Sequence, residues 1–166
     1  TSGGGFALMV EGLSLAGQAE LPIVVVLAQR TGPSTGLPTY TAQSDLDFAI
    51  SAGQGEFPRV VIAPADVEQA YAWSKLGLDL AWRYQVPVFV LGDRTLNDNV
   101  CSFSDAEVPA LPRMAEVDWD GAPTGDDPDQ AYQRYLITDD GVSPLAFPGR
   151  SGAVVKGNSY THDEWG

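Results

Sequence analysis

Three almost continuous apolar runs in the first hundred residues most strongly constrain how this chain can fold. They cover residues 23–28, 59–63 and 87–91, and prolines or glycines flank each of them. Short apolar runs between such breaks are typical of strands that are buried on both faces. Strands of this kind occur in parallel sheets whose two faces are covered by helices.

Helical periodicity fills the intervals between these runs. We expect helices over residues 3–20, 43–52 and 67–84, the first with Ser2 as its cap and the last with Asp66 and Gln69 as a capping box. The predicted buried residues of these three helices are Phe6, Met9, Val10, Leu13 and Ala16, then Leu46, Phe48 and Ile50, then Val67, Ala70, Tyr71, Ser74, Leu78, Ala81 and Trp82. The alternation predicts an α/β fold with three layers, a mostly parallel sheet and helices on both faces.

Composition divides the chain into three parts. Residues 1–100 carry the predicted core, and residues 101–134 form an acidic excursion rich in proline and glycine. Residues 135–166 are predicted to be a C-terminal extended segment that closes the same domain, with a turn at residues 139–141. Because Thr1 opens in what should be a loop between a strand and a helix, we expect the N-terminal part of the domain to be missing.

The charge and the single cysteine restrict the classes of partner. The net charge is −13, from 22 acidic and 9 basic residues, which predicts no binding to nucleic acid or to an anionic membrane. No run approaches the roughly 18 apolar residues of a membrane span. Cys101 alone can form neither an internal disulfide nor a four-thiolate iron–sulfur site, so a cytoplasmic, reducing location is expected. His162 is expected to make a structural or interface hydrogen bond rather than to act in catalysis.

The polar segment at residues 29–39 is the first candidate site. It follows the strand at residues 23–28, and open α/β sheets bind ligands beyond the carboxyl ends of their strands. Its Arg30 can bind a carboxylate in a bidentate manner, and nearby hydroxyl groups can orient the ligand. These hydroxyls belong to Thr31, Ser34, Thr35 and Thr39. The segment predicts a site for a small anionic substrate; a surface turn with an exposed arginine is the alternative.

The glycines at the start of the chain are the second candidate site. Gly3, Gly4 and Gly5 begin the first predicted helix, and such helix N-termini can bind anions. The segment lacks the Lys-Ser/Thr ending of a nucleotide P-loop and the spaced glycines of a dinucleotide fingerprint. From the residues alone, close packing of the backbone and direct phosphate contact are both open.

Several segments together resemble a known family. The glycine-rich start, the strand with its hydroxyl-rich segment, and Gln43-x-Asp45-Leu46 resemble the α subunit of 2-oxoacid:ferredoxin oxidoreductases, particularly the 2-oxoglutarate type. Further similar stretches lie at residues 53–59, 84–88 and 159–164. The resemblance is dense over residues 1–100, thin from 101 to about 135, and visible again from Tyr135 onward.

This resemblance implies a thiamine diphosphate-binding fold of the pyrimidine-domain type. It implies that Arg30 binds the substrate carboxylate and that the glycine segment is mainly a packing and interface element near the cofactor. Ser34, Thr35 and Thr39 are expected to shape the substrate pocket or the loop itself. Thiamine diphosphate would be shared with a β subunit, which would carry Mg²⁺ and an iron–sulfur cluster. No metal ligand and no catalytic residue is assigned to these 166 residues, which alone are expected to be inactive.

The implied reaction is the oxidative decarboxylation of a 2-oxoacid, 2-oxoglutarate being favoured, to an acyl-coenzyme A. Two electrons would pass to ferredoxin, and the assembly would be αβ or (αβ)₂. Two alternatives remain open at this point. One is a subunit of another thiamine-dependent 2-oxoacid decarboxylase, and the other is a non-catalytic acidic α/β module that serves assembly.

Overall fold

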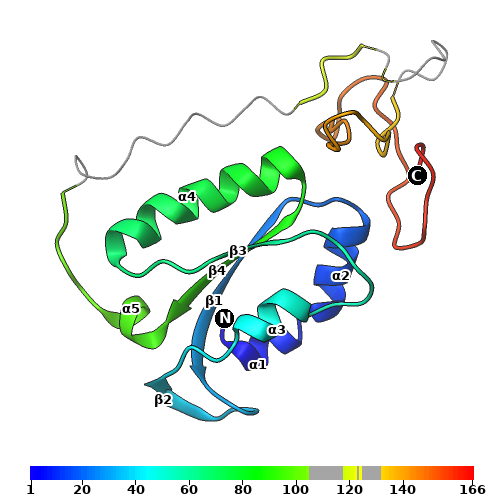
Figure 1. Cartoon of the computed structure of the whole chain (residues 1–166). Helices are drawn as coiled ribbons and strands as arrows, with labels where there is room; N and C mark the ends of the chain where they lie inside the picture. The colour runs from blue at the N-terminus through cyan, green and yellow to red at the C-terminus, as the bar shows by residue number, and fades with distance from the viewer. Residues whose placement is uncertain (105–117, 123, 125–131) are drawn as a thin grey trace.

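A computed structural model describes residues 1–104, 118–122, 124 and 132–166 of the chain. Within these residues four strands form one sheet in the order β2-β1-β4-β3 (Figure 1). The strands are β1 (Ile23–Thr31), β2 (Leu37–Thr41), β3 (Val60–Ile62) and β4 (Pro87–Asp93). Strand β4 is parallel to both β1 and β3, and only β2 is antiparallel to its neighbour β1. The predicted mostly parallel sheet is confirmed.

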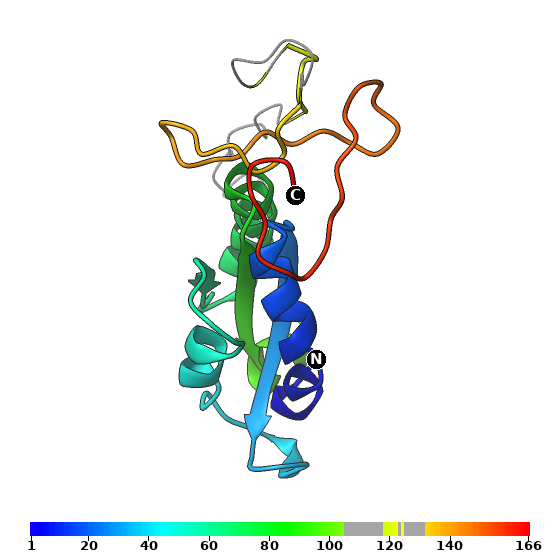
Figure 2. The same ribbon diagram turned by 90° about the vertical axis from the view of Figure 1, so that its right-hand side faces the viewer.

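Helices cover both faces of this sheet, as Figures 1 and 2 show. They are α1 (Gly3–Ala7), α2 (Val10–Gln18), α3 (Leu46–Ser51), α4 (Val67–Tyr84) and the short α5 (Arg94–Asp98). The core between the sheet and α1–α3 is built on the fully buried Phe6, Leu27 and Phe89. On the opposite face α4 lies close to the sheet, because a Cβ atom on Gly77 would be 3.2 Å from Val88 Cγ1. The predicted three layers are confirmed.

The predicted helix over residues 3–20 is divided into α1 and α2. The chain turns at Leu8 and Met9, whose side chains are 89% and 47% exposed, so the prediction of a buried Met9 is wrong. Ser2 precedes α1 as expected, but its side chain makes no capping hydrogen bond. Three glycines and the absence of this bond leave α1 only one short turn, and hydrophobic burial of Phe6 fixes its position.

Helix α4 begins where the sequence predicts but buries a different face. The Asp66 carboxylate accepts a 2.7 Å hydrogen bond from Gln69 N, which confirms the cap. Tyr71 and Leu78, predicted to be buried, are 59% and 46% exposed, and Ser74 is exposed as well. Ala81 is fully buried, as predicted, and Gly77 lies against the sheet, because its lack of a side chain allows the helix backbone to approach the strands.

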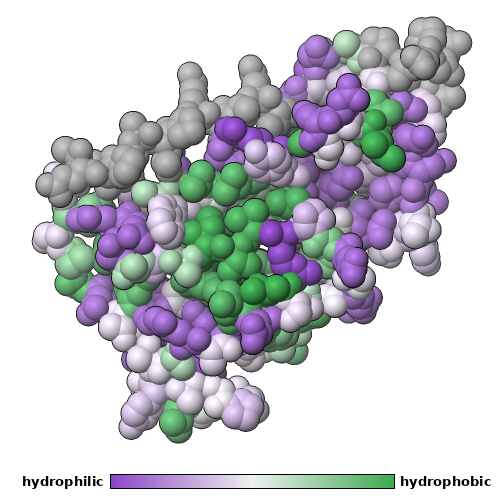
Figure 3. Space-filling model, in the orientation of Figure 1, coloured by the Kyte–Doolittle hydropathy of each residue, from purple (hydrophilic) through white to green (hydrophobic). Residues whose placement is uncertain are grey.

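Helix α3 is shorter than predicted and also leaves large side chains uncovered. It spans Leu46–Ser51 rather than residues 43–52, and only Ala49 is fully buried. Leu46 and Ile50 are 47% and 52% exposed, so the prediction that they are buried is wrong. Figure 3, in the orientation of Figure 1, shows hydrophobic side chains gathered between α3 and α4 on the face turned to the viewer.

Strand β1 continues through the start of the segment that the sequence predicts to be a loop. It runs to Thr31, and a hairpin then leads to β2, with Arg30 paired opposite Thr41. The prediction that Arg30 lies in a loop is therefore wrong. The extension is possible because β2 supplies hydrogen-bond partners beside the last residues of β1. Thr1 also pairs with β1, since its amino group donates to Val26 O at 2.9 Å.

Described residues of the C-terminal part form neither a helix nor a named strand. Residues 132–166 follow an irregular path at the end of the molecule opposite the β2 hairpin (Figure 2). The predicted turn at residues 139–141 is confirmed by a bond from Gly141 N to Thr138 O. Of the predicted excursion at 101–134, residues 105–117, 123 and 125–131 lie outside the described residues. Among the described helices, none has the length and apolar character required to cross a bilayer.

Candidate functional site

The carboxyl ends of β1 and β4 bring polar residues together at one end of the sheet. In the parallel register of these strands, Gln29 lies opposite Asp93. The residue that follows each of them in the sequence is an arginine. Arg30 still belongs to β1, and Arg94 is the first residue of α5. Carboxyl ends of parallel strands are the usual place for ligands in open α/β sheets. The candidate site is therefore built by pairing of two distant parts of the sequence.

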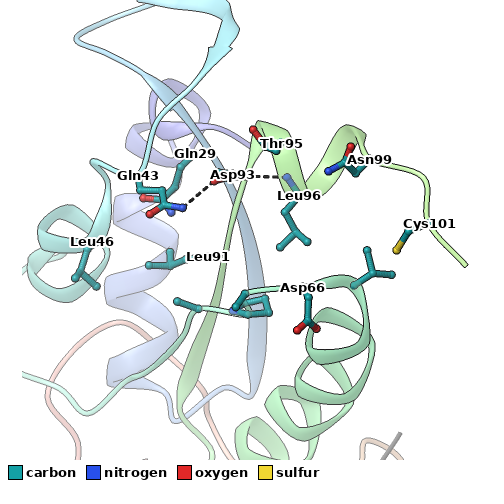
Figure 4. Close-up of a pocket in the computed structure, with 14 residues that line it drawn as sticks. Gln29, Gln43, Leu46, Asp66, Leu91, Asp93, Thr95, Leu96, Asn99 and Cys101 are labelled. Carbon is teal, nitrogen blue, oxygen red and sulfur yellow. Dashed lines mark hydrogen bonds between the residues drawn. The ribbon is translucent and has the colours of Figure 1, made fainter. Parts of the chain in front are cut away.

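A cavity of about 560 Å³ lies on the α3 side of this end of the sheet (Figure 4). The Asp93 carboxylate accepts hydrogen bonds of 2.8 Å from Leu96 N and from Gln43 Nε2. These bonds hold the pKa of Asp93 below its usual range, and the bond from the Leu96 backbone has the larger effect. The cavity also has an apolar wall that includes Leu46, Leu91 and Leu96. Its acidic groups make it unsuited to an anionic ligand.

A smaller cavity of about 220 Å³ contains the cationic groups of the site. Arg30 lines it, and among the described residues its guanidinium makes no hydrogen bond and no ion pair. The other lining residues are Ser2, Ala28, Gln29, Pro38, Arg94, Asn97 and Asp98. Two guanidinium groups face one carboxylate here, so the cavity is locally cationic in a chain of net charge −13. Such a local potential favours a small anion.

The three glycines at the chain start are packed against protein atoms. A Cβ atom on Gly5 would lie 1.9 Å from Thr1 Oγ1, and one on Gly3 would lie 3.0 Å from Asp45 Oδ1. A Cβ atom on Gly4 would be 3.7 Å from the Ser34 carbonyl oxygen. These contacts support the packing interpretation of the glycines. A ligand could reach them only through their backbone amides.

Asp45 is the acidic group beside these glycines. Its backbone N donates to Gln29 Oε1 at 3.0 Å, which ties the start of α3 to β1. Its Oδ2 atom is buried and has no hydrogen-bond partner among the described residues, and burial raises the pKa of the carboxyl group. Gln43 and Asp45 thus both make hydrogen bonds to protein groups.

The predicted hydroxyl groups do not all gather around Arg30. Ser34 and Thr35 lie exposed in the turn of the hairpin, where Ser34 has a positive φ of 56°. Thr39 lines a separate hollow of about 350 Å³ that it shares with Arg94. In the structure the hairpin turn lies beside the glycine segment, since the Ser34 carbonyl is close to Gly4. Arg30 and Ser2 line the same small cavity.

Sequence reasoning did not identify Arg94 and Asn97 as members of the site. A Cβ atom on Gly92 would lie 2.7 Å from Asn97 Oδ1, so α5 folds back over the end of β4 at this glycine. The sequence does contain a signal for Arg94. Gly92-Asp93-Arg94 comes after the apolar run at residues 87–91, as Arg30 comes after the apolar run at residues 23–28. The pairing of the two strands makes both arginines line one cavity.

The described groups at this site offer guanidinium donors for an anion rather than ligands for a metal ion. In the part of the chain that the structure describes, no group of three His, Cys, Asp or Glu side chains could hold a metal ion. Asp93 is engaged by Leu96 and Gln43, and Asp98 forms a 2.8 Å ion pair with Arg94.

Comparison with known proteins gives consistent matches along the whole chain. The family model for pyruvate flavodoxin/ferredoxin oxidoreductase, thiamine diphosphate-binding, matches residues 1–165. The α subunit of 2-oxoacid:ferredoxin oxidoreductase 1 from Sulfurisphaera tokodaii is 42% identical over 166 residues, which are 98% of this chain and 25% of that protein. The 2-oxoglutarate synthase subunit KorA from Archaeoglobus fulgidus is 38% identical over 118 residues, 71% of this chain and 32% of its own length.

A solved structure matches as well. It is that of 2-oxoglutarate:ferredoxin oxidoreductase from Magnetococcus marinus with 2-oxoglutarate, coenzyme A and succinyl-CoA bound. The TM-score is 0.83 at 38% identity, and the match covers 99% of this chain and 28% of that one. The chain thus spans about a quarter of the length of the Sulfurisphaera tokodaii subunit and of the Magnetococcus marinus chain.

Proposed function

Because the chain belongs to the thiamine diphosphate-binding family of pyruvate flavodoxin/ferredoxin oxidoreductases, we propose that it acts within the α subunit of a 2-oxoacid:ferredoxin oxidoreductase. The complete enzyme would decarboxylate a 2-oxoacid, transfer the acyl group to coenzyme A and pass electrons to ferredoxin. The names of the relatives support this reaction class. The ligands of the Magnetococcus marinus enzyme support 2-oxoglutarate as a substrate.

The observation that carries the proposal is that the guanidinium of Arg30 has no partner among the described residues. A 2-oxoacid presents a planar carboxylate, and a guanidinium binds such a group through two parallel hydrogen bonds. Arg30 is held on β1 by pairing with β2, while its side chain lines the small cavity at the carboxyl end of the sheet. Its role is to bind and orient the substrate carboxylate. Ser34, Thr35 and Thr39 of the hairpin would shape the entrance to this site.

The cofactor and its metal are assigned to a shared site with a β subunit. Thiamine diphosphate supplies the carbanion chemistry when it is bound. The amides of Gly3–Gly5 would lie toward it on this chain, whereas Mg²⁺ and the iron–sulfur cluster would belong to the β subunit. A single cysteine in 166 residues supports this division, because an iron–sulfur cluster needs several thiolates. The assembly would be αβ or (αβ)₂ and would work in the cytoplasm.

The domain organisation belongs to the same proposal. Residues 1–100 would form the core of the pyrimidine-type domain, and residues 135–166 would close it, with 101–134 as an excursion between them. The contacts of the C-terminal segment support this division, since Tyr135 N donates to Glu164 O and His162 Nε2 lies 2.9 Å from Gln18 O of α2. The His162 contact is the structural hydrogen bond expected from the sequence.

Enzyme assays test the proposed function. The full-length chain is co-purified with its β subunit, and the reduction of methyl viologen is followed with a panel of 2-oxoacids in the presence and absence of coenzyme A. We expect reduction that depends on coenzyme A. Absence of reduction with every 2-oxoacid, in a complex that contains thiamine diphosphate and an intact cluster, would refute the proposal.

A further inference from the structure

Two arginines, not one, line the small cavity at the carboxyl end of the sheet. Gln29 of β1 is paired with Asp93 of β4, and Arg30 and Arg94 are the residues that follow these partners. Both side chains line the same cavity of about 220 Å³. Its volume is below the roughly 300–1,000 Å³ of pockets for drug-sized ligands, so it suits a small metabolite.

Arg94 is held in position by two neighbours. Its Nε atom lies 2.8 Å from Asp98 Oδ2, and its Nη1 donates a 2.8 Å hydrogen bond to Pro38 O of β2. Among the described residues, no group binds its Nη2. A guanidinium has five N–H donors, so Arg94 retains donors for a ligand while Asp98 and Pro38 fix its orientation. Asp98 and Pro38 thus orient an Arg94 side chain that stays 41% exposed and open to a ligand.

The charges of the cavity distinguish classes of 2-oxoacid. A monocarboxylic 2-oxoacid such as pyruvate needs one cation, and the unpaired Arg30 is sufficient for it. A dicarboxylic 2-oxoacid carries a second carboxylate at the other end of a short chain. The ion pair of Arg94 with Asp98 does not satisfy Arg94 fully, because the two side chains are 41% and 60% exposed and exposed pairs are weak.

We propose that Arg94 determines substrate specificity by binding the second carboxylate of a dicarboxylic 2-oxoacid whose first carboxylate is bound by Arg30. This inference rests on the proposed function of Arg30. It names a second substrate-binding residue and the substrate class that the residue selects. A purely structural Arg94 would only connect α5 to the hairpin through Pro38, and that role would affect all substrates equally.

A comparison of two substrates separates these roles. The variants Arg94→Gln and Arg30→Lys of the full-length chain are each assembled with the β subunit, and kcat/KM is measured for 2-oxoglutarate and for pyruvate. For Arg94→Gln we expect the ratio of kcat/KM for 2-oxoglutarate to that for pyruvate to fall about tenfold or more, the loss typical of a hydrogen bond to a charged group. For Arg30→Lys, both values should fall together.

The matched variant is Asp98→Asn, which keeps Arg94 but removes its competing carboxylate. It should raise the same ratio about two- to threefold, because Arg94 then has more donors for the substrate. An unchanged ratio in Arg94→Gln, or equal losses with both substrates together with a lower Tm, would overturn the inference. If Arg94→Gln overturns the inference in this way but Arg30→Lys still lowers both kcat/KM values, the proposed function stands without the role of Arg94.

Discussion

Two arginines at opposite ends of the fold show how the same side chain can serve binding or stability. Arg30, at the carboxyl end of the sheet, has no protein partner among the described residues. Arg134, at the other end, is 5% exposed and binds Glu20 Oε2 at 3.1 Å and Glu20 O at 2.9 Å. Its guanidinium also lies 5.0 Å from the ring centre of Tyr135. A guanidinium whose donors are used internally stabilises the fold, and one whose donors are free can bind a ligand.

Arg134 also completes the C-terminal end of α2. The last carbonyl groups of a helix lack intrahelical partners and carry partial negative charge, so cations stabilise them. Arg134 Nη2 donates toward the carbonyl oxygens of Ala19 and Glu20, and the His162 ring lies 2.9 Å from that of Gln18. His162 also stacks on Tyr135 at 3.7 Å. This end of α2 therefore anchors the irregular C-terminal segment.

The largest expected effect is a loss of stability on removing Arg134. Arg134→Met should lower the free energy of unfolding of the full-length chain by about 2–3 kcal/mol. The value is at the low end for a broken buried pair because Glu20 is 34% exposed and regains water. Urea denaturation followed by circular dichroism measures it.

The control is Arg150→Met, since the Arg150–Asp118 pair has side chains that are 37% and 30% exposed. Its ion pair should contribute at most about 1 kcal/mol, and its hydrogen bond to Trp119 O about as much again. If Arg134→Met costs no more than Arg150→Met, the distinction between the two ends of the fold is wrong.

The next effect is on substrate affinity and concerns Arg30. Arg30→Lys keeps the charge but loses the bidentate geometry, so the KM for a 2-oxoacid should rise about tenfold or more. The free energy of unfolding should stay within about 0.5 kcal/mol, because no internal bond is lost. Steady-state kinetics of the complete complex and urea denaturation provide the two readouts. An unchanged KM would remove Arg30 from substrate binding.

A smaller effect, on stability, is expected for Asp66, whose carboxylate at the carboxyl end of the sheet already has a hydrogen-bond partner within the protein. Asp66 caps α4 by accepting a hydrogen bond from Gln69 N. Asp66→Ala should lower the free energy of unfolding by about 1 kcal/mol, the usual cost of losing such a cap. Asp66→Asn keeps an acceptor and should cost only a few tenths of that. Equal losses in both variants would mean that the cap contributes nothing.

The smallest effect is the pH dependence caused by Asp93. Its pKa is lowered in the folded state by the Leu96 amide and by Gln43, so its contribution to stability is present above the unfolded value of about 3.9. That contribution is lost as the pH falls below this value. Asp93→Asn should be about 0.5 kcal/mol less stable than the wild type at pH 6. The difference should disappear near pH 2, and a difference that stays constant with pH would contradict this account.

Much of the fold follows from local sequence patterns. The strands β1, β3 and β4 and the start of α4 are predicted because apolar runs and a capping pair are short-range signals. The buried face of α4 is predicted only in part, since Ala81 is buried as expected but Tyr71 and Leu78 are exposed and Gly77 is buried in their place. The choice depends on the small Gly77, which lets the helix approach Val88 and Ile62. Such a fit is a property of two surfaces that meet only in the folded protein.

The candidate site was predicted only in part, because it too depends on contacts between distant parts of the chain. The sequence identifies Arg30 because a polar segment follows an apolar strand. It does not reveal that β1 extends through Arg30, because the partner β2 lies beyond a turn. Nor does it indicate that Arg94 shares the cavity, because this depends on the register between β1 and β4. Arg134 was missed because its partner Glu20 lies more than a hundred residues earlier in the chain.

The position of the substrate carboxylate relative to Arg30 tests the central claim most directly. It can be measured in a crystal structure of the complete complex, full-length chain and β subunit, with a bound 2-oxoacid. The account predicts that both terminal nitrogens of Arg30 lie about 2.7–2.9 Å from the two oxygens of one carboxylate. A 2-oxoacid bound without Arg30, with this guanidinium in bulk solvent or paired with an acidic side chain of the protein, would contradict it.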